Sequence, residues 1–213
     1  MPSDCTKIGA FYDDLSPDGY DEMFRVAVKY TDPKIITENF FELKLSKDVK
    51  VLDVGAGTGI IGELLHEGGI TNIDALDAST TFLDTLVTRG YYKTAKIAML
   101  GYGNFPEPER KELYDVVTAC GVFLKGHMPK EALDEIHQYL KPNGYFVTAM
   151  RQCYYDPFEP MGYFGKFQSL LDSGKFKLVK KNTFVRGLTP EQNVTNNDLW
   201  ALQDCFGFVF QKI

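Results

Sequence analysis

Several features that would indicate other classes of protein are scarce in this sequence of 213 residues. Its four cysteines are far apart and form no Cys-x-x-Cys pair, so neither a disulfide framework nor a metal site is predicted. No apolar run approaches the roughly 18 residues that a transmembrane helix needs, and the first residues lack the pattern of a signal peptide. We therefore expect a soluble, cytoplasmic protein with no membrane among its partners.

An excess of basic residues is also absent. The chain holds 23 Lys and Arg against 29 Asp and Glu, which gives a formal net charge of −6. Nucleic-acid binding depends on Lys and Arg that displace counterions from the phosphate backbone. We therefore expect no nucleic-acid partner.

No internal repeat, low-complexity tract or Ser/Gly linker divides the chain. A chain of this length can bury roughly 70% of the surface that its unfolded form exposes. We expect a single domain over residues 1–213, in which residues 1–45 form a helical arm or lid and residues 48–213 an α/β core. The protein is expected to be a monomer or a dimer.

From about Lys50 onward, short apolar runs rich in β-branched residues alternate with stretches of helical periodicity. Five runs are predicted as strands: Val49–Val54, Asn72–Asp77, Lys96–Leu100, Tyr114–Ala119 and Tyr145–Met150. Two more, Lys175–Phe184 and Cys205–Lys212, are expected to form an antiparallel edge, the last with Phe206, Phe208 and Phe210 on one face. The pattern predicts a Rossmann-like, doubly wound sheet of about seven strands, whose ligand binds beyond the carboxyl ends of the strands.

The loop after the first predicted strand, Asp53-Val-Gly-Ala-Gly-Thr-Gly, fits two glycine motifs. Read from Gly57, it is the G-x-G-x-x-G of a dinucleotide site. In that fold the first glycine directly follows the strand, and here that glycine is Gly55, from which the pattern fails at Ile60. Asp53 would also bring a carboxylate close to a pyrophosphate, where like charges repel. An NAD-dependent oxidoreductase is therefore disfavoured.

A cationic ligand suits the same loop better. S-adenosylmethionine has positive sulfonium and ammonium groups, a carboxylate that backbone N–H groups can bind, and a ribose diol. Asp77 ends the next strand, where a carboxylate can accept hydrogen bonds from both ribose hydroxyls. The structural alternatives are that Asp53 caps the helix after the loop and that Asp77 forms an Asx-turn. We favour the cofactor interpretation.

These residues carry a family resemblance. Four segments resemble class I S-adenosylmethionine-dependent methyltransferases: Val51–Gly59, Asp77–Ser79, Tyr114–Val117 and Leu140–Gly144. The arm motif Phe11-Tyr-Asp-Asp14, followed by Tyr20-Asp21, and the segment Gly121–Pro129 are similar to the Williams-Beuren-region methyltransferase-like subgroup. The resemblance implies methyl transfer with S-adenosylmethionine as cofactor and S-adenosylhomocysteine as product.

The resemblance also implies where the cofactor binds. The residues expected around its methionine end are Asp53, Gly55, Ala56, Gly57 and Cys120. Asp77 would bind the ribose and Ala78 would lie under the adenine. Many relatives carry an Asp-Ala pair after the third strand, where this chain has Leu100-Gly101. Adenine recognition is therefore expected from the backbone or from Asn104.

Two aromatic residues of the arm are further candidates. Tyr12 and Tyr20 are expected to close over the sulfonium, where a ring face gains a cation-π attraction of about 0.5 to 2 kcal/mol. The alternative is that both rings simply pack on the edge of the sheet.

Methyl transfer is an in-line displacement, so positioning and exclusion of water can supply much of the catalysis. For a hydroxyl acceptor, His127 is the candidate general base, because it follows the fourth strand; a capping or merely exposed histidine is the alternative. Phe123, Arg151 and Tyr154 are candidate substrate contacts, although Arg151 could equally anchor an acidic loop. The aromatic residues between Met150 and Lys175 could cover an apolar pocket or pack as an amphipathic helix.

The acceptor class follows from absent motifs. After the fourth strand, Ala119-Cys-Gly-Val122 lacks the Asn/Asp-Pro-Pro-aromatic run of amino-methylating DNA enzymes, and no Pro-Cys nucleophile is present. We therefore predict a small-molecule acceptor methylated on oxygen, nitrogen or sulfur. A protein methyltransferase of the same fold and a catalytically silent S-adenosylmethionine-binding protein are the alternatives.

Overall fold

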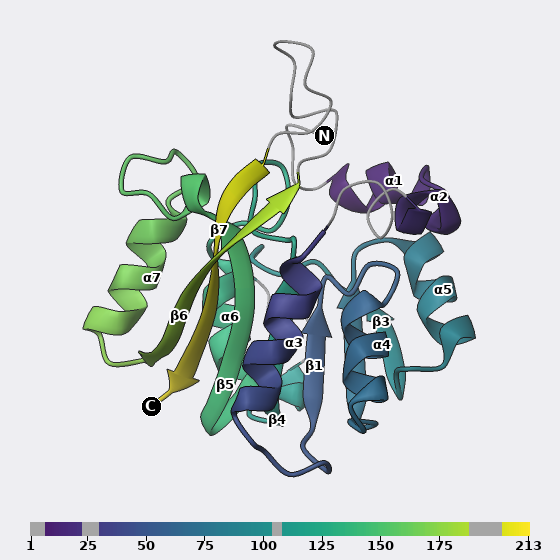
Figure 1. Ribbon diagram of the computed structural model, residues 1–213, viewed down its shortest axis with the longest axis horizontal. Helices are drawn as coiled ribbons and strands as arrows, with labels where there is room; N and C mark the ends of the chain where they lie inside the picture. The colour runs from purple at the N-terminus through teal and green to yellow at the C-terminus, as the bar shows by residue number, and fades with distance from the viewer. Residues whose placement is uncertain (1–6, 23–29, 104–107, 188–201) are drawn as a thin grey trace.

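The computed structural model describes residues 7–22, 30–103, 108–187 and 202–213, so Asn104 lies outside the described part of the chain. A seven-stranded sheet with the order β3-β2-β1-β4-β5-β7-β6 forms the centre (Figure 1). The strands are β1 (Val51–Val54), β2 (Ile73–Asp77), β3 (Thr94–Ile97), β4 (Tyr114–Cys120), β5 (Leu140–Arg151), β6 (Phe176–Gly187) and β7 (Leu202–Lys212). The first five are parallel, and β7 runs antiparallel to β5 and β6. The predicted doubly wound sheet with an antiparallel edge is confirmed.

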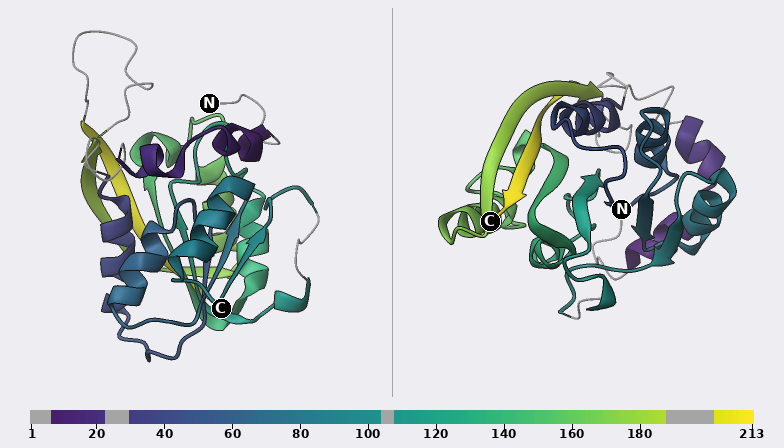
Figure 2. Two further views of the ribbon diagram at one scale, coloured as in Figure 1. Left: turned by 90° about the vertical axis from the view of Figure 1, so that its right-hand side faces the viewer. Right: turned by 90° about the horizontal axis from the view of Figure 1, so that it is seen from below.

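Helices cover both faces of this sheet and the carboxyl ends of its strands. They are α1 (Ile8–Asp13), α2 (Pro17–Asp21), α3 (Asp32–Glu42), α4 (Ile60–Glu67), α5 (Thr80–Arg89), α6 (Ala132–Tyr139) and α7 (Tyr163–Asp172). Helices α3 and α4 pack on one face and α6 and α7 on the other, while α1 and α2 lie over the carboxyl ends of the strands (Figures 1 and 2). Among the described helices, none combines the length and the apolar character needed to cross a membrane.

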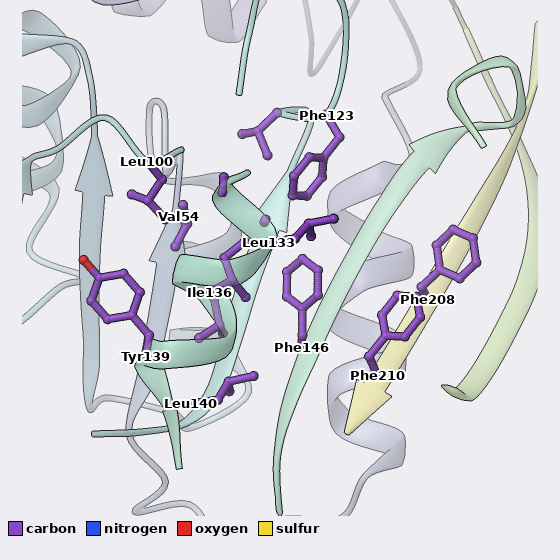
Figure 3. Packing of buried hydrophobic residues seen from close by; sticks show 14 of the residues in the cluster. Val54, Leu100, Phe123, Leu133, Ile136, Tyr139, Leu140, Phe146, Phe208 and Phe210 are labelled. Atoms are coloured by element: carbon purple, nitrogen blue, oxygen red, sulfur yellow. The ribbon is translucent and has the colours of Figure 1, made fainter. Parts of the chain in front are cut away.

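The larger core cluster lies between the sheet and helices α6 and α7. Figure 3 shows the part of it around α6. Leu133 and Ile136 of α6 meet Phe146 of β5 there, and all three are fully buried. Phe208 and Phe210 stack in the same cluster with ring centres 5.4 Å apart, and Phe206 packs against it. The predicted aromatic face of the last strand is confirmed, because alternate residues of a strand point to the same side.

The third strand differs from its prediction. It was expected at Lys96–Leu100 and is observed as β3, at Thr94–Ile97. Leu100 is only 2% exposed, yet it lies in the loop after the strand. Burial of an apolar residue in a loop gives the same sequence signal as burial in a strand, so hydrophobicity alone cannot place this boundary.

Candidate functional site

The carboxyl ends of β1, β2 and β4 open onto a cavity with about 680 Å³ of empty space, part of it open to solvent. We call it the main cavity. The expected site residues that line it are Tyr12, Tyr20, Gly55, Gly57, Asp77, Ala78, Leu100, Cys120 and His127.

A smaller cavity of about 340 Å³ adjoins the main cavity on the side of α3 and α4. It shares Tyr20, Gly55, Gly57 and Cys120 with the main cavity. Its other lining residues include Ala56, which was expected at the methionine end, and Tyr30, which sequence reasoning missed. The two cavities therefore meet at the glycine loop and the end of β4.

The glycine loop adopts a backbone that only glycine tolerates well. Gly55, Gly57 and Gly59 have φ values of 66°, 57° and 93°. A Cβ atom at Gly55 would lie 2.3 Å from Cγ1 of Val122, so the loop and the segment after β4 approach closely. A Cβ atom at Gly57 would meet nothing within 4 Å. The space above Gly57 is therefore open, as a loop that cradles a ligand requires.

Asp53 lies beneath this loop and lines neither cavity among the described residues. Its side chain is 1% exposed and accepts hydrogen bonds from the hydroxyls of Tyr92 and Thr118, each at 2.8 Å. Burial raises its pKa to about 6, although both hydrogen bonds act in the opposite direction. The hydroxyl of Tyr92 also accepts a hydrogen bond from the backbone N–H of Gly62 in α4. Asp53 thus supports the loop and its helix from below, through Tyr92.

Asp77 lines the main cavity and also holds the backbone around it. Its carboxylate accepts hydrogen bonds from the backbone N–H of Gly57 at 2.7 Å and of Ser79 at 2.9 Å. Burial raises the pKa of Asp77 despite these bonds. The structural Asx contact is therefore present, and a carboxylate with two such bonds retains lone pairs that can accept from a ribose.

The N-terminal arm is docked over the main cavity by polar contacts. Asp13 at the end of α1 accepts hydrogen bonds from the Ser79 hydroxyl at 2.7 Å and the Thr81 N–H at 3.0 Å, so it caps α5. In α2, Asp21 accepts a hydrogen bond from the hydroxyl of Thr58 and pairs with Arg89 at 2.7 Å. Sequence reasoning missed Asp13 and Asp21 as docking residues, although both lie in the motif segments that carried the resemblance.

Tyr12 and His127 join the arm to the loop after β4. The Tyr12 hydroxyl lies 2.7 Å from Nε2 of His127, and Nδ1 of His127 lies 3.3 Å from the carbonyl oxygen of Lys125. Burial lowers the pKa of His127 to about 4, so its imidazole is neutral near pH 7. A carbonyl only accepts, so Nδ1 carries the proton and Nε2 accepts from Tyr12. His127 is 6% exposed, which excludes the merely exposed alternative.

The two arm tyrosines pack on α5 and also face the main cavity. Tyr12 and Tyr20 line the main cavity, and their rings pack against Phe82 of α5 at centre distances of 5.4 Å and 5.3 Å. Packing of the rings on α5 and a place in the wall of the main cavity are therefore compatible.

The candidate substrate contacts lie outside the described linings of both cavities. Phe123 is 2% exposed and packs edge-on against Tyr163 of α7 at 5.7 Å. Tyr154 packs against the same core cluster. Tyr163 and Phe167 are buried in that cluster, so this part of the aromatic segment packs on the sheet, as one of the two interpretations expected.

Two further residues have clear positions. Gly101 has a φ of 92°, and its N–H donates to Glu135 of α6 at 2.8 Å, so it anchors the loop of Leu100 to that helix. Arg151 ends β5 and is 9% exposed.

Comparison with known proteins shows which proteins the chain around this site is similar to. A family model for a methyltransferase domain matches residues 52–146. The chain is similar to methyltransferase-like protein 27 of Homo sapiens, with 28% identity over 143 residues, 66% of this chain and 56% of that protein. It is also similar to the mitochondrial ubiquinone biosynthesis O-methyltransferase of Schizosaccharomyces pombe, with 28% identity over 54% of this chain and 42% of that protein. The match thus spans about half the length of these curated relatives.

A solved structure shares the fold. The TehB-like SAM-dependent methyltransferase of Corynebacterium glutamicum superposes with a TM-score of 0.59 at 16% identity, over 96% of this chain and 99% of that chain. At this identity the likeness concerns the fold and leaves the acceptor open.

Proposed function

We propose that this chain is a class I S-adenosylmethionine-dependent methyltransferase and that it transfers the methyl group of S-adenosylmethionine to a small-molecule acceptor. The observation that carries the small-molecule assignment is the main cavity at the carboxyl ends of the strands, which residues of α1 and α2 help to line. A roofed cavity suits a compact acceptor better than a folded protein surface.

The residues around the main cavity fit the cofactor. Open space lies above Gly57, the Asp77 carboxylate faces the cavity, and the rings of Tyr12 and Tyr20 line it. When bound, S-adenosylmethionine supplies a methyl group activated by a positive sulfonium. We propose that Asp77 binds the ribose, that Ala78 and Leu100 contact the adenine, and that Gly55, Ala56, Gly57 and Cys120 surround the methionine end. Asp53 would act on this end through the loop that it supports.

Besides binding the cofactor, the chain positions the reactants and excludes water from the site. Tyr12 and Tyr20 close the cavity from the arm, and a dry, ordered site favours an in-line displacement. His127 is neutral near pH 7, which is the form that can take a proton from a hydroxyl acceptor. In this structure Nε2 of His127 is bonded to Tyr12, so a base role requires an acceptor hydroxyl to replace that bond.

Labelled-methyl transfer to a cell lysate tests the proposal. The lysate is incubated with protein and S-adenosylmethionine carrying a labelled methyl group, and its protein and metabolite fractions are then separated. Label in the metabolite fraction supports the proposal. Label in proteins alone would assign a protein acceptor, and cofactor binding without any transfer would assign a silent binding protein.

A further inference from the structure

A buried cluster of charged residues lies beside the smaller cavity, on the face of the sheet that α3 covers. It consists of Arg151 at the end of β5, Arg186 in β6 and Asp32 at the start of α3, which are 9%, 7% and 1% exposed. Cys205 of β7 is opposite Arg151 on one side and opposite Phe184 on the other. Because alternate residues share a face, Arg186 lies on the same side as Phe184 and Arg151. We call Arg151, Arg186 and Asp32 the arginine cluster.

Among the described residues, the cluster holds two guanidinium groups and one carboxylate, so one positive charge is not balanced. Arg186 pairs with Asp32 through Nη1 at 2.9 Å, which balances one of the two positive charges. Arg151 makes no hydrogen bond or ion pair with any residue in the described part of the chain, and its guanidinium lies 5.7 Å from the ring centre of Tyr154. Burial and then the charge of Arg186 lower the pKa of Arg151. A buried cation without a counter-charge is costly, so the site favours an anion.

Contacts link the arginine cluster to the smaller cavity. The guanidinium of Arg186 lies 5.3 Å from the ring centre of Tyr30, and the Tyr30 hydroxyl lies 3.2 Å from Sγ of Cys120. Both Tyr30 and Cys120 line the smaller cavity. In the sheet, Cys120 is opposite Ala149, so Arg151 comes two residues beyond the position level with Cys120. The cluster thus borders the end of β4 on the β5 side.

The arginine cluster lies apart from the part of the site around Asp77. Asp77 ends β2, whereas Arg151 ends β5, and strands β1 and β4 lie between them. A cofactor whose ribose is at Asp77 and whose methionine end is at the glycine loop therefore has the arginine cluster on its far side. An acceptor that approached the methyl group from this side would pass the arginine cluster.

We propose that Arg151 binds a carboxylate group of the methyl acceptor, so that the enzyme acts on anionic small molecules. This assignment rests on the proposed methyltransferase function. One carboxylate balances the single excess charge of the cluster, and a guanidinium can bind both of its oxygens at once. The cofactor also carries a carboxylate, and the experiments below separate the two sources.

Titration with the product and with a shortened analogue shows whether Arg151 binds the carboxylate of the acceptor or that of the cofactor. S-adenosylhomocysteine has the carboxylate, whereas 5′-methylthioadenosine lacks it. Isothermal titration of Arg151→Gln should give both ligands the affinity that they have for the wild type. A loss of affinity for S-adenosylhomocysteine alone would assign Arg151 to the cofactor and overturn the proposal. Lys34→Gln is the matched control, because Lys34 is exposed and the substitution removes the same charge.

A carboxylate probe tests the site directly. Acetate is titrated into the complex with S-adenosylhomocysteine, and the Nε–H resonance of Arg151, identified by its absence in Arg151→Gln, is followed by nuclear magnetic resonance. We expect a saturable shift with acetate and none with acetamide. No shift, or equal shifts with both probes, would overturn the proposal.

Fractionated metabolites test the acceptor class. A deproteinised extract is separated by anion exchange, and each fraction is assayed with labelled S-adenosylmethionine. We expect label in the retained, anionic fraction, and a fall of kcat/KM by roughly 10-fold or more in Arg151→Gln but not in Lys34→Gln. If Arg151→Gln fails to fold, Arg151→Lys keeps the charge, and its loss of the two-oxygen contact should still lower kcat/KM.

The outcomes separate the two proposals. Label only in the unretained, neutral or cationic fraction would overturn the anionic acceptor and leave the methyltransferase proposal intact. Label in no fraction, from protein that binds S-adenosylmethionine, would overturn both.

Discussion

Two aspartates of this site support the backbone of the glycine loop, and one of them also faces the main cavity. Asp77 faces the main cavity while it holds the N–H groups of Gly57 and Ser79, and Asp53 acts through Tyr92 without reaching the cavity wall. Substitution of either aspartate therefore changes the shape of the loop as well as its chemistry. A test of a binding role needs a matched control and a check of folding.

Asp77→Ala should weaken the binding of S-adenosylmethionine by roughly 10-fold, because it removes a charged acceptor for the ribose and the anchor of the glycine loop. Isothermal titration measures the affinity, and circular dichroism checks the fold. Asp84→Ala is the control, since Asp84 is exposed on α5 and carries the same charge. Equal affinities for both variants would remove Asp77 from the binding site.

His127 should make the stability of the protein depend on pH. Burial lowers its pKa to about 4 from the ordinary value of 6.5. As the pH falls below 6.5, the unfolded chain takes up a proton that the folded chain refuses, so the contribution of His127 to stability falls. Between pH 7.5 and 4.5 the wild type should lose on the order of 2 kcal/mol more than His127→Gln. Urea unfolding at both pH values measures the difference, and parallel losses would contradict it.

At the scale of elements, the arm and the α/β core meet through close backbone contact as well as polar contacts. Asp13 caps α5 from α1, and Asp21 of α2 pairs with Arg89 at the other end of α5. Gly9 of α1 lies against the backbone of Ala78, where a Cβ atom would be 2.4 Å from the carbonyl oxygen. The roof of the main cavity thus depends on a glycine.

Gly9→Ala should displace α1 and weaken the binding of S-adenosylmethionine by roughly 10-fold, because overpacking against a rigid backbone costs about 1 to 3 kcal/mol. Gly19→Ala in α2 is the matched control, since its Cβ atom would come no closer than 3.7 Å to Ser16. Isothermal titration of both variants measures the effect. Unchanged binding in Gly9→Ala would show that the arm does not close over the cofactor.

At the scale of the whole molecule, one aromatic core joins the parallel strands to the antiparallel edge. Phe146 of β5 and Phe210 of β7 belong to the same buried cluster (Figure 3). Phe167 of α7 belongs to it too, and its ring stacks on that of Phe210 at 4.9 Å. The strands that frame the site therefore share their core with the strands that carry Arg186 and Cys205.

Phe210→Ala should lower the free energy of unfolding by about 3 to 5 kcal/mol, through lost burial and the cavity that it leaves. Because the core is shared, near-ultraviolet and far-ultraviolet circular dichroism should report the same transition. Phe158→Ala should change stability by no more than about 0.5 kcal/mol, since Phe158 is 94% exposed. Two separate transitions would mean that the antiparallel edge unfolds independently.

The sequence by itself determined the sheet, its antiparallel edge and the glycine loop. These features depend on local signals: apolar runs, helical periods, and glycines at positions with positive φ. The same signals placed Asp77, Cys120 and His127 at strand ends, and strand ends of a doubly wound sheet converge on one site.

Only the tertiary structure decided what each of these residues contacts. The partners of Asp53 are Tyr92 and Thr118, and His127 meets Tyr12 across 115 positions of sequence. Arg151 stands out only through its tertiary surroundings. It is buried beside the ion pair of Arg186 and Asp32 and has no counter-charge of its own among the described residues. Burial and pairing depend on which distant segments pack together, and no local pattern of residues records that.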